Sequence, residues 1–174
     1  MGDDVSATVQ LPFGFKFYGT TYTSISIGSN GLANFTGGAA NYYQNGPLPD
    51  AELPNGSIYP FWDDLDMSTN ASSAILTGTF GSAPNRQFVI QWRNMITRDD
   101  HSNPFPSTFS FSAILSENDD VTFTYDLLST ANLRSRGSSA TIGIENGSGN
   151  VYLQRSFNRP FADISLPIRF TAPK

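Results

Sequence analysis

Hydrophobic and polar residues alternate along most of this chain with a period of two. Phe13, Phe15 and Phe17 occupy alternate positions near the N-terminus, and Thr-Phe-Ser-Phe-Ser-Ala-Ile-Leu at residues 108–115 repeats the pattern. Such alternation is typical of β-strands with one buried face, because successive side chains of a strand point to opposite sides. No stretch shows the spacing of an amphipathic helix. The pattern therefore predicts an all-β protein with little or no helix.

Turn residues divide the chain into about ten or eleven short strands. Ser29-Asn30-Gly31 is a tight hairpin signal, and Pro167 restricts the last strand to an edge or a bulge. We expect an antiparallel β-sandwich of the jelly-roll or Greek-key kind, with residues 1–174 forming a single domain. The expected strands are Phe13–Tyr18, Tyr22–Ile27, Leu32–Thr36, Ile58–Trp62, Ala74–Phe80, Arg86–Trp92, Thr108–Leu115, Val121–Leu127, Ala140–Glu145, Val151–Arg155 and Ile164–Phe170.

The composition excludes several classes of protein. Charged residues make up only 14% of the chain, so the polar surface must come from Ser, Thr, Asn, Gln and Gly, as in many secreted β-proteins. A net charge of −5 argues against nucleic-acid binding, which needs clustered Lys and Arg. No apolar run is long enough for membrane insertion, and the absence of Cys excludes a disulfide framework. The acidic start at residues 1–4 carries no signal-peptide pattern. We therefore expect either a module of a longer exported chain or a protein assembled in the cytoplasm.

Several segments, in their order along the chain, resemble the extracellular domain named after nidogen and related modules of bacterial surface proteins. The resemblance extends over about residues 13–146, and it implies an extracellular β-rich module of adhesion or matrix proteins without a catalytic residue. The segments that carry it are Phe15-Lys-Phe-Tyr-Gly19, Ser29-Asn-Gly-Leu-Ala-Asn-Phe35, Ile58-Tyr-Pro-Phe-Trp-Asp-Asp-Leu-Asp66, Phe88-Val-Ile-Gln-Trp-Arg-Asn94, Thr108–Leu115, Val121-Thr-Phe-Thr-Tyr125 and Ala140-Thr-Ile-Gly-Ile-Glu-Asn146.

Residues that could support catalysis are few. His101 is the only histidine, and it lies in a polar loop with Asp99 and Asp100 without any nucleophile motif nearby. One His without Cys cannot fill a tetrahedral zinc site. We interpret His101 as an exposed loop residue and expect a protein that is not an enzyme.

Calcium is the metal that the sequence favours. After the apolar strand Ile58–Trp62, Asp64, Asp66, Ser68 and Asn70 place oxygen-bearing side chains at alternate positions. This spacing lets a loop outside the core turn several oxygens toward one hard cation. The alternative is a solvated acidic turn whose carboxylates accept backbone N–H bonds. Asp63 fits that structural role.

A ligand site is expected in the long loop of residues 37–56. Tyr42, Tyr43, Gln44 and Asn45 combine aromatic rings with amides, which suits the recognition of sugars. The alternative is that both tyrosines fold over the end of the sandwich as a lid.

The sequence thus favours a non-catalytic binding or adhesion module at the cell surface or in a secreted protein. Its expected partners are an extracellular glycan or protein surface. The alternative is a structural subunit of a virion or an extracellular filament, whose partners would be copies of itself.

Overall fold

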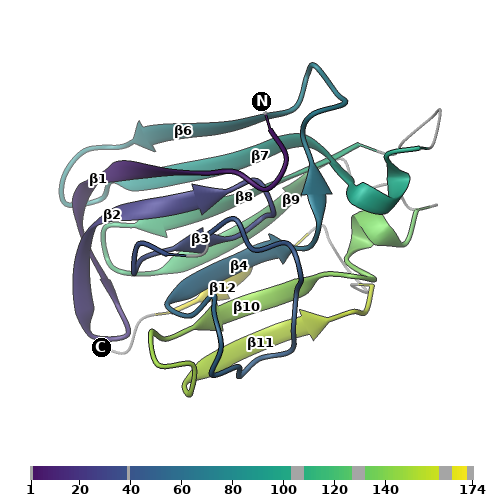
Figure 1. Cartoon of the computed structure of the whole chain (residues 1–174). Helices are drawn as coiled ribbons and strands as arrows, with labels where there is room; N and C mark the ends of the chain where they lie inside the picture. The colour runs from purple at the N-terminus through teal and green to yellow at the C-terminus, as the bar shows by residue number, and fades with distance from the viewer. Residues whose placement is uncertain (1, 39, 103–107, 127–131, 161–165, 172–174) are drawn as a thin grey trace.

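Two antiparallel sheets packed face to face form the fold, and the first of them faces the viewer in Figure 1. The computed structural model describes residues 1–174 except 1, 39, 103–107, 127–131, 161–165 and 172–174. Leu127 and residues 164–165 of the expected strands thus lie outside the described residues. The all-β sandwich predicted from the sequence is confirmed. Among the described residues, no helix is long and apolar enough to cross a membrane.

The first sheet has the strand order β1-β2-β3-β4-β10-β11. The hairpin signal at Ser29-Asn30-Gly31 connects β2 and β3, and Gly31 has a φ of +71° there. A Cβ at Gly31 would lie 1.9 Å from the Phe61 carbonyl oxygen, so this turn requires glycine. The strands are β1 Ser6–Phe17, β2 Thr20–Gly28, β3 Ala33–Asn34, β4 Ser57–Trp62, β10 Thr141–Glu145 and β11 Tyr152–Phe157.

The second sheet has the order β12-β9-β8-β7-β5, and β6 also pairs with β7. Short 3₁₀ helices at Arg98–Asp100 and Arg134–Arg136 lie in the connections. The strands are β5 Leu65–Asp66, β6 Ala74–Phe80, β7 Gln87–Thr97, β8 Phe109–Ser116, β9 Val121–Asp126 and β12 Ile168–Phe170.

The strand boundaries differ from the expected ones where pairing with a distant segment extends a strand beyond its alternating pattern. The strand expected from Phe13 begins at Ser6, because residues 6–10 pair with β2 although their side chains are mostly exposed. The two-residue β5 also was not expected, and β7 continues beyond Trp92 to Thr97, where it pairs with β5. An alternating pattern reveals only strands that bury one face. It therefore does not reveal residues 6–10, which are held mainly by backbone hydrogen bonds to β2.

Aromatic side chains fill the space between the sheets. Trp62 and Trp92 are buried, as the sequence predicted. The Trp92 ring stacks on Phe111 with 5.1 Å between ring centroids, and its indole Nε1 donates a 2.8 Å hydrogen bond to the Gly28 carbonyl oxygen. This bond joins β7 of the second sheet to the end of β2 in the first. Trp92 therefore both fills the core and satisfies a buried backbone acceptor.

Replacing Trp92 with Phe should lower the free energy of unfolding by about 2–4 kcal/mol, because it leaves a cavity and an unpaired Gly28 carbonyl oxygen. Urea unfolding measures this loss. Phe80→Ala is the matched control, since Phe80 is 60% exposed and its truncation should change stability by no more than about 0.5 kcal/mol. A small loss in both variants would contradict the structural role given to Trp92.

Candidate functional site

The loop of residues 37–56 crosses the outer face of the first sheet, in front of β4 and β10 in Figure 1. Buried contacts hold its first half in place. A Cβ at Gly28 would lie 1.6 Å from the Ala40 carbonyl oxygen, so the loop approaches β2 closely. The Trp62 indole donates a 2.9 Å hydrogen bond to the Tyr42 carbonyl oxygen. The backbone that carries the two tyrosines is therefore pre-organised by the sheet below it.

A cavity of about 280 Å³ opens beside this segment, and two aromatic side chains form part of its wall. Tyr42 is 46% exposed and Tyr43 is 44% exposed, so neither ring closes over the sandwich as a buried lid. The lining residues are Asp4, Asn41, Tyr42, Tyr43 and Gln44. Three of the four residues proposed from the sequence as ligand-binding thus meet at one cavity.

Asn45, the fourth of these residues, points elsewhere. Its amide Nδ2 donates to Thr141 Oγ1 at 3.1 Å and to Asn158 Oδ1 at 3.0 Å, which ties the loop to β10 and to the end of β11. Asp4 was not expected at the cavity. Because it comes from the N-terminus, far from the loop in sequence, only the acidic composition of residues 1–4 could have drawn attention to it.

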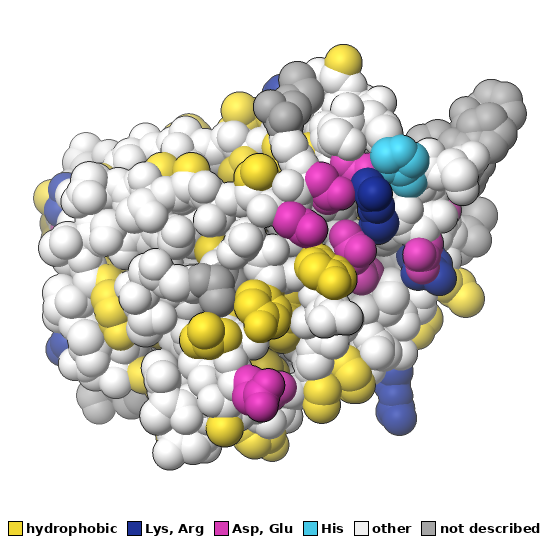
Figure 2. Space-filling model, in the orientation of Figure 1, with side chains coloured by type: hydrophobic (Ala, Val, Ile, Leu, Met, Phe, Trp, Pro, Cys, Tyr) yellow, Lys and Arg dark blue, Asp and Glu magenta, His cyan; other side chains and the backbone are white. Residues whose placement is uncertain are grey.

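An acidic cluster adjoins the cavity. Carboxylate oxygens of Asp3, Asp4 and Asp64 lie within 4.8 Å of one another, which is a spacing that could hold a metal ion. Figure 2 shows acidic side chains gathered on this face next to hydrophobic ones, with basic and histidine side chains beside them. Arg98 Nη1 pairs with Asp3 Oδ2 at 2.9 Å, whereas Asp3 Oδ1 is buried and has no hydrogen-bond partner among the described residues.

Burial and like charges destabilise the ionised form of this cluster. Burial, followed by the charges of Asp4 and Asp3, raises the pKa of Asp64 to about 6. Burial also raises the pKa of Asp3, together with the charges of Asp66 and Asp4. The cluster therefore favours the approach of a cation or a proton.

The side chain of Asn30 connects the cavity with the acidic cluster. Asn30 is fully buried, and its Nδ2 donates to Asp4 Oδ1 at 2.8 Å and to the Asn41 carbonyl oxygen at 3.1 Å. Its Oδ1 accepts a 3.0 Å hydrogen bond from the Leu65 backbone N–H. The turn residue recognised in the sequence thus also positions three separate segments around the site.

The structure places the four residues of the predicted calcium loop in different surroundings. Asp64 joins Asp3 and Asp4, whereas Asp66 lies in β5 with no exposed surface. Asp66 Oδ1 accepts 2.6 Å hydrogen bonds from both the backbone N–H and the hydroxyl of Ser68. Asn70 Oδ1 instead accepts from Ser72, and its Nδ2 donates to the Asn94 carbonyl oxygen. The expectation that this loop lies outside the core is wrong for Asp66, because pairing of β5 with β7 buries it.

Asp66 also holds two cationic or titratable side chains. Its Oδ2 accepts a 3.0 Å bond from Arg98 Nη1 and a short contact from His101 Nδ1. Burial acts to raise the pKa of Asp66, but the hydrogen bonds from Ser68 and His101 outweigh burial and bring this pKa below its ordinary value. His101 is exposed, yet Asp66 orients its ring, which sequence analysis did not reveal.

Asp63 takes the structural role proposed from the sequence. Its Oδ1 accepts a 2.9 Å bond from the Asp64 backbone N–H, and its Oδ2 accepts a 2.6 Å bond from the Ser139 hydroxyl. The carboxylate therefore links the end of β4 to the loop before β10.

The fold and the site define an all-β sandwich module with a polar and aromatic cavity on one face. A family model described as NIDO related matches residues 1–169, so the chain belongs to that family. The nidogen-type resemblance seen in the sequence is thereby confirmed, and membership of this family indicates an extracellular module. No curated protein and no solved structure shows significant similarity to the chain.

Asp66→Ala distinguishes a hydrogen-bonded carboxylate from a calcium ligand. The observed contacts predict a loss of about 2 kcal/mol in unfolding free energy even in the presence of a chelator, because buried donors lose their acceptor. The loss stays below that of a wholly buried pair, since Arg98 and His101 are partly exposed. Thermal melts with calcium and with chelator measure it. If the variant kept full stability in chelator and lost only a calcium-induced gain, coordination by Asp66 would be supported instead.

Asp64→Asn should raise the melting temperature at pH 7 in the presence of chelator. The folded-state pKa of about 6 lies above the ordinary value of 3.8 for an aspartate, so the folded protein binds this proton more tightly than the unfolded chain. That stability is present below the unfolded pKa and is lost as the pH rises through about 6. The gain from the substitution should therefore vanish toward pH 4. Thermal melts between pH 4 and pH 7 measure this gain. Glu52→Gln is the control, because Glu52 is an exposed carboxylate. A gain in the Asp64 variant that did not depend on pH would argue against the raised pKa.

Proposed function

We propose that this protein is a non-catalytic binding module of a surface or secreted multidomain protein, and that it recognises an extracellular glycan. The observation that carries the proposal is the cavity at which Tyr42, Tyr43, Gln44, Asn41 and Asp4 meet. Membership of the NIDO-related family supports the extracellular setting.

The chemistry of the cavity suits a sugar. Exposed tyrosine rings offer flat apolar area for the C–H faces of a pyranose, while each phenol keeps a hydroxyl for hydrogen bonding. The amides of Asn41 and Gln44 supply both donors and acceptors, which match the mixed hydrogen bonding of sugar hydroxyls. Asp4 adds a carboxylate acceptor to the lining.

A glycan site of this kind would suit a module that takes part in adhesion. The Trp62 indole binds the Tyr42 carbonyl oxygen, and the Asn30 amide binds the neighbouring Asn41 carbonyl oxygen. A ligand would therefore meet a largely ordered surface. Pre-organisation of this kind reduces the entropy lost on binding. Repetition of weak sites in a multidomain protein would then raise the overall avidity.

Binding to a panel of oligosaccharides by calorimetry tests the proposal. Tyr42→Ala and Tyr43→Ala should each weaken binding about tenfold, because one stacked ring is lost while the backbone contacts stay. Tyr152→Ala is the control, since Tyr152 is 40% exposed and lies on β11, outside the cavity. Absence of binding to any oligosaccharide, or equal affinity of all three variants, would refute a glycan site at Tyr42 and Tyr43.

A structural subunit of a virion or an extracellular filament is the alternative proposal. In the part of the chain that the structure describes, β11 is an edge strand with a partner on one side only, and such an edge gives a subunit a means of association. The oligomeric state in solution distinguishes the two proposals, because a subunit must associate with copies of itself, whereas an adhesion module works as a monomer.

A further inference from the structure

Both sheets end on the same side of the sandwich. In the part of the chain that the structure describes, β11 pairs only with β10, and β12 pairs only with β9. β12 contains only three residues, so it covers little of the first sheet. Each terminal strand leaves one row of backbone N–H and C=O groups without a strand partner.

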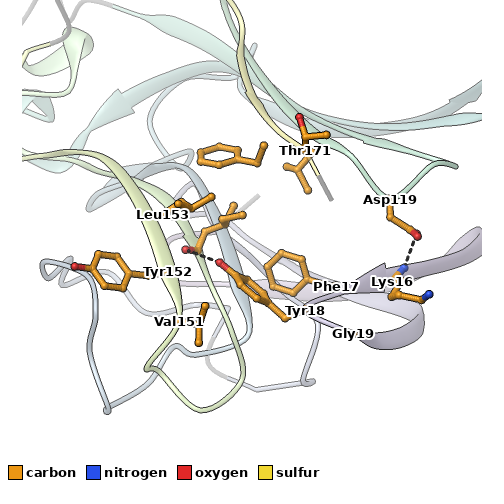
Figure 3. A pocket seen from close by; sticks show the side chains of 12 residues that line it. Lys16, Phe17, Tyr18, Gly19, Asp119, Val151, Tyr152, Leu153 and Thr171 are labelled. Atoms are coloured by element: carbon orange, nitrogen blue, oxygen red, sulfur yellow. Dashed lines mark hydrogen bonds between the residues drawn. The ribbon is translucent and has the colours of Figure 1, made fainter. Parts of the chain in front are cut away.

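An apolar cavity of about 520 Å³ lies between these two terminal strands. In Figure 3 the rings of Phe17 and Tyr18 lie between Leu153 and Val151 on one side and Lys16 and Asp119 on the other. The remaining lining residues are Gly19, Val121, Ile144, Tyr152, Phe170 and Thr171. This size and composition are typical of sites that accept an apolar group.

Leu153 shows why the cavity exists. It pairs with Ile144 of β10 and shares that residue's face of the sheet, yet Ile144 is buried while Leu153 is 55% exposed. Among the described residues, no strand of the second sheet lies beyond β12 to cover this part of β11. A further strand beside β12 would cover Leu153 and continue the second sheet.

A positive charge lies next to this uncovered surface. The bulge between β10 and β11 leaves Arg155 without a partner residue on β10, and its side chain is exposed. Burial raises the pKa of the Tyr125 phenol on β9, and the charge of Arg155 acts against that rise. Arg155 lies two residues after Leu153 on β11, so an extended strand that covers Leu153 would also pass Arg155.

We propose that this open side accepts an extended peptide strand from a partner protein, which pairs with the free edge of β12, places an apolar side chain over Leu153 and sets a carboxylate against Arg155. The free edge of a strand pairs with an extended backbone, and the apolar cavity beside it fits an apolar side chain of the same peptide. The surface shares no residue with the cavity at Tyr42 and Tyr43.

A second copy of this chain fits the surface less well than a separate acidic strand does. Two copies that paired through β11 about a two-fold axis would present the same residues to each other. The segment Tyr152–Phe157 contains Arg155 but no acidic residue, so neither Arg155 would gain a partner of opposite charge from the β11 strand of the other copy. Charge complementarity therefore favours an occupant that carries Asp or Glu.

An NMR titration with the peptide acetyl-Thr-Val-Thr-Leu-Thr-Asp-Thr-amide tests the proposal. Backbone amides of β11 and β12 should shift in a saturable manner. Leu153→Ser and Arg155→Glu should each weaken binding about tenfold, as expected for one contributing interface side chain. Arg155→Glu should instead bind a peptide that has Lys in place of Asp. Leu76→Ser on β6 is the matched control and should leave binding unchanged, since Leu76 is 41% exposed on another terminal strand.

Four results would overturn the proposal. They are the absence of saturable shifts, shifts confined to other strands, equal binding by the Leu153 and Leu76 variants, and a dimer by light scattering that Leu153→Ser dissociates. The last result would make a second copy the occupant. If Arg155→Glu did not fold, Arg155→Gln would replace it, and unchanged affinity for the acidic peptide in that variant would refute the charge contact.

Discussion

The candidate site depends on one buried polar side chain, that of Asn30. Its amide reaches Asp4, the Asn41 backbone and the Leu65 backbone, and each belongs to a different segment of the chain. A buried amide of this kind is stable only when its donors and acceptors are paired, so the three segments have little freedom to move independently. The cavity, the acidic cluster and the buried strand β5 are therefore parts of one hydrogen-bonded arrangement.

The carboxylates at this site differ in how the fold treats their charged forms. At the acidic cluster, burial and like charges raise the pKa values of Asp3 and Asp64, and Arg98 divides its contacts between Asp3 and Asp66. Asp66 is stabilised in its charged form by four short contacts from Ser68, Arg98 and His101. Neighbouring carboxylates therefore differ in role, and the difference comes from the partners that the fold gives them.

The two cavities also differ in what they could recognise. The one at Tyr42 and Tyr43 combines exposed rings with amides and a carboxylate on an ordered loop. The one between β11 and β12 is mainly apolar and is flanked by strand edges that have no partner strand among the described residues. The glycan proposed for the first cavity and the peptide strand proposed for the second therefore require different chemistry.

The sequence by itself determined the fold class and most strands, because period-two alternation and turn residues report burial and chain reversal locally. It also singled out Tyr42, Tyr43, Gln44 and Asn45, since aromatic residues in a polar loop stand out, and the first three of these line the cavity. Only the tertiary structure decided that Asp64 and Asp66 have separate partners, that Asp4 joins the cavity, and that Leu153 is uncovered. Each of these depends on which segments the strand pairing brings together over long sequence distances. Local periodicity contains no information about that pairing, so spacing along the chain cannot decide whether two carboxylates share a cation or whether a strand has a neighbour.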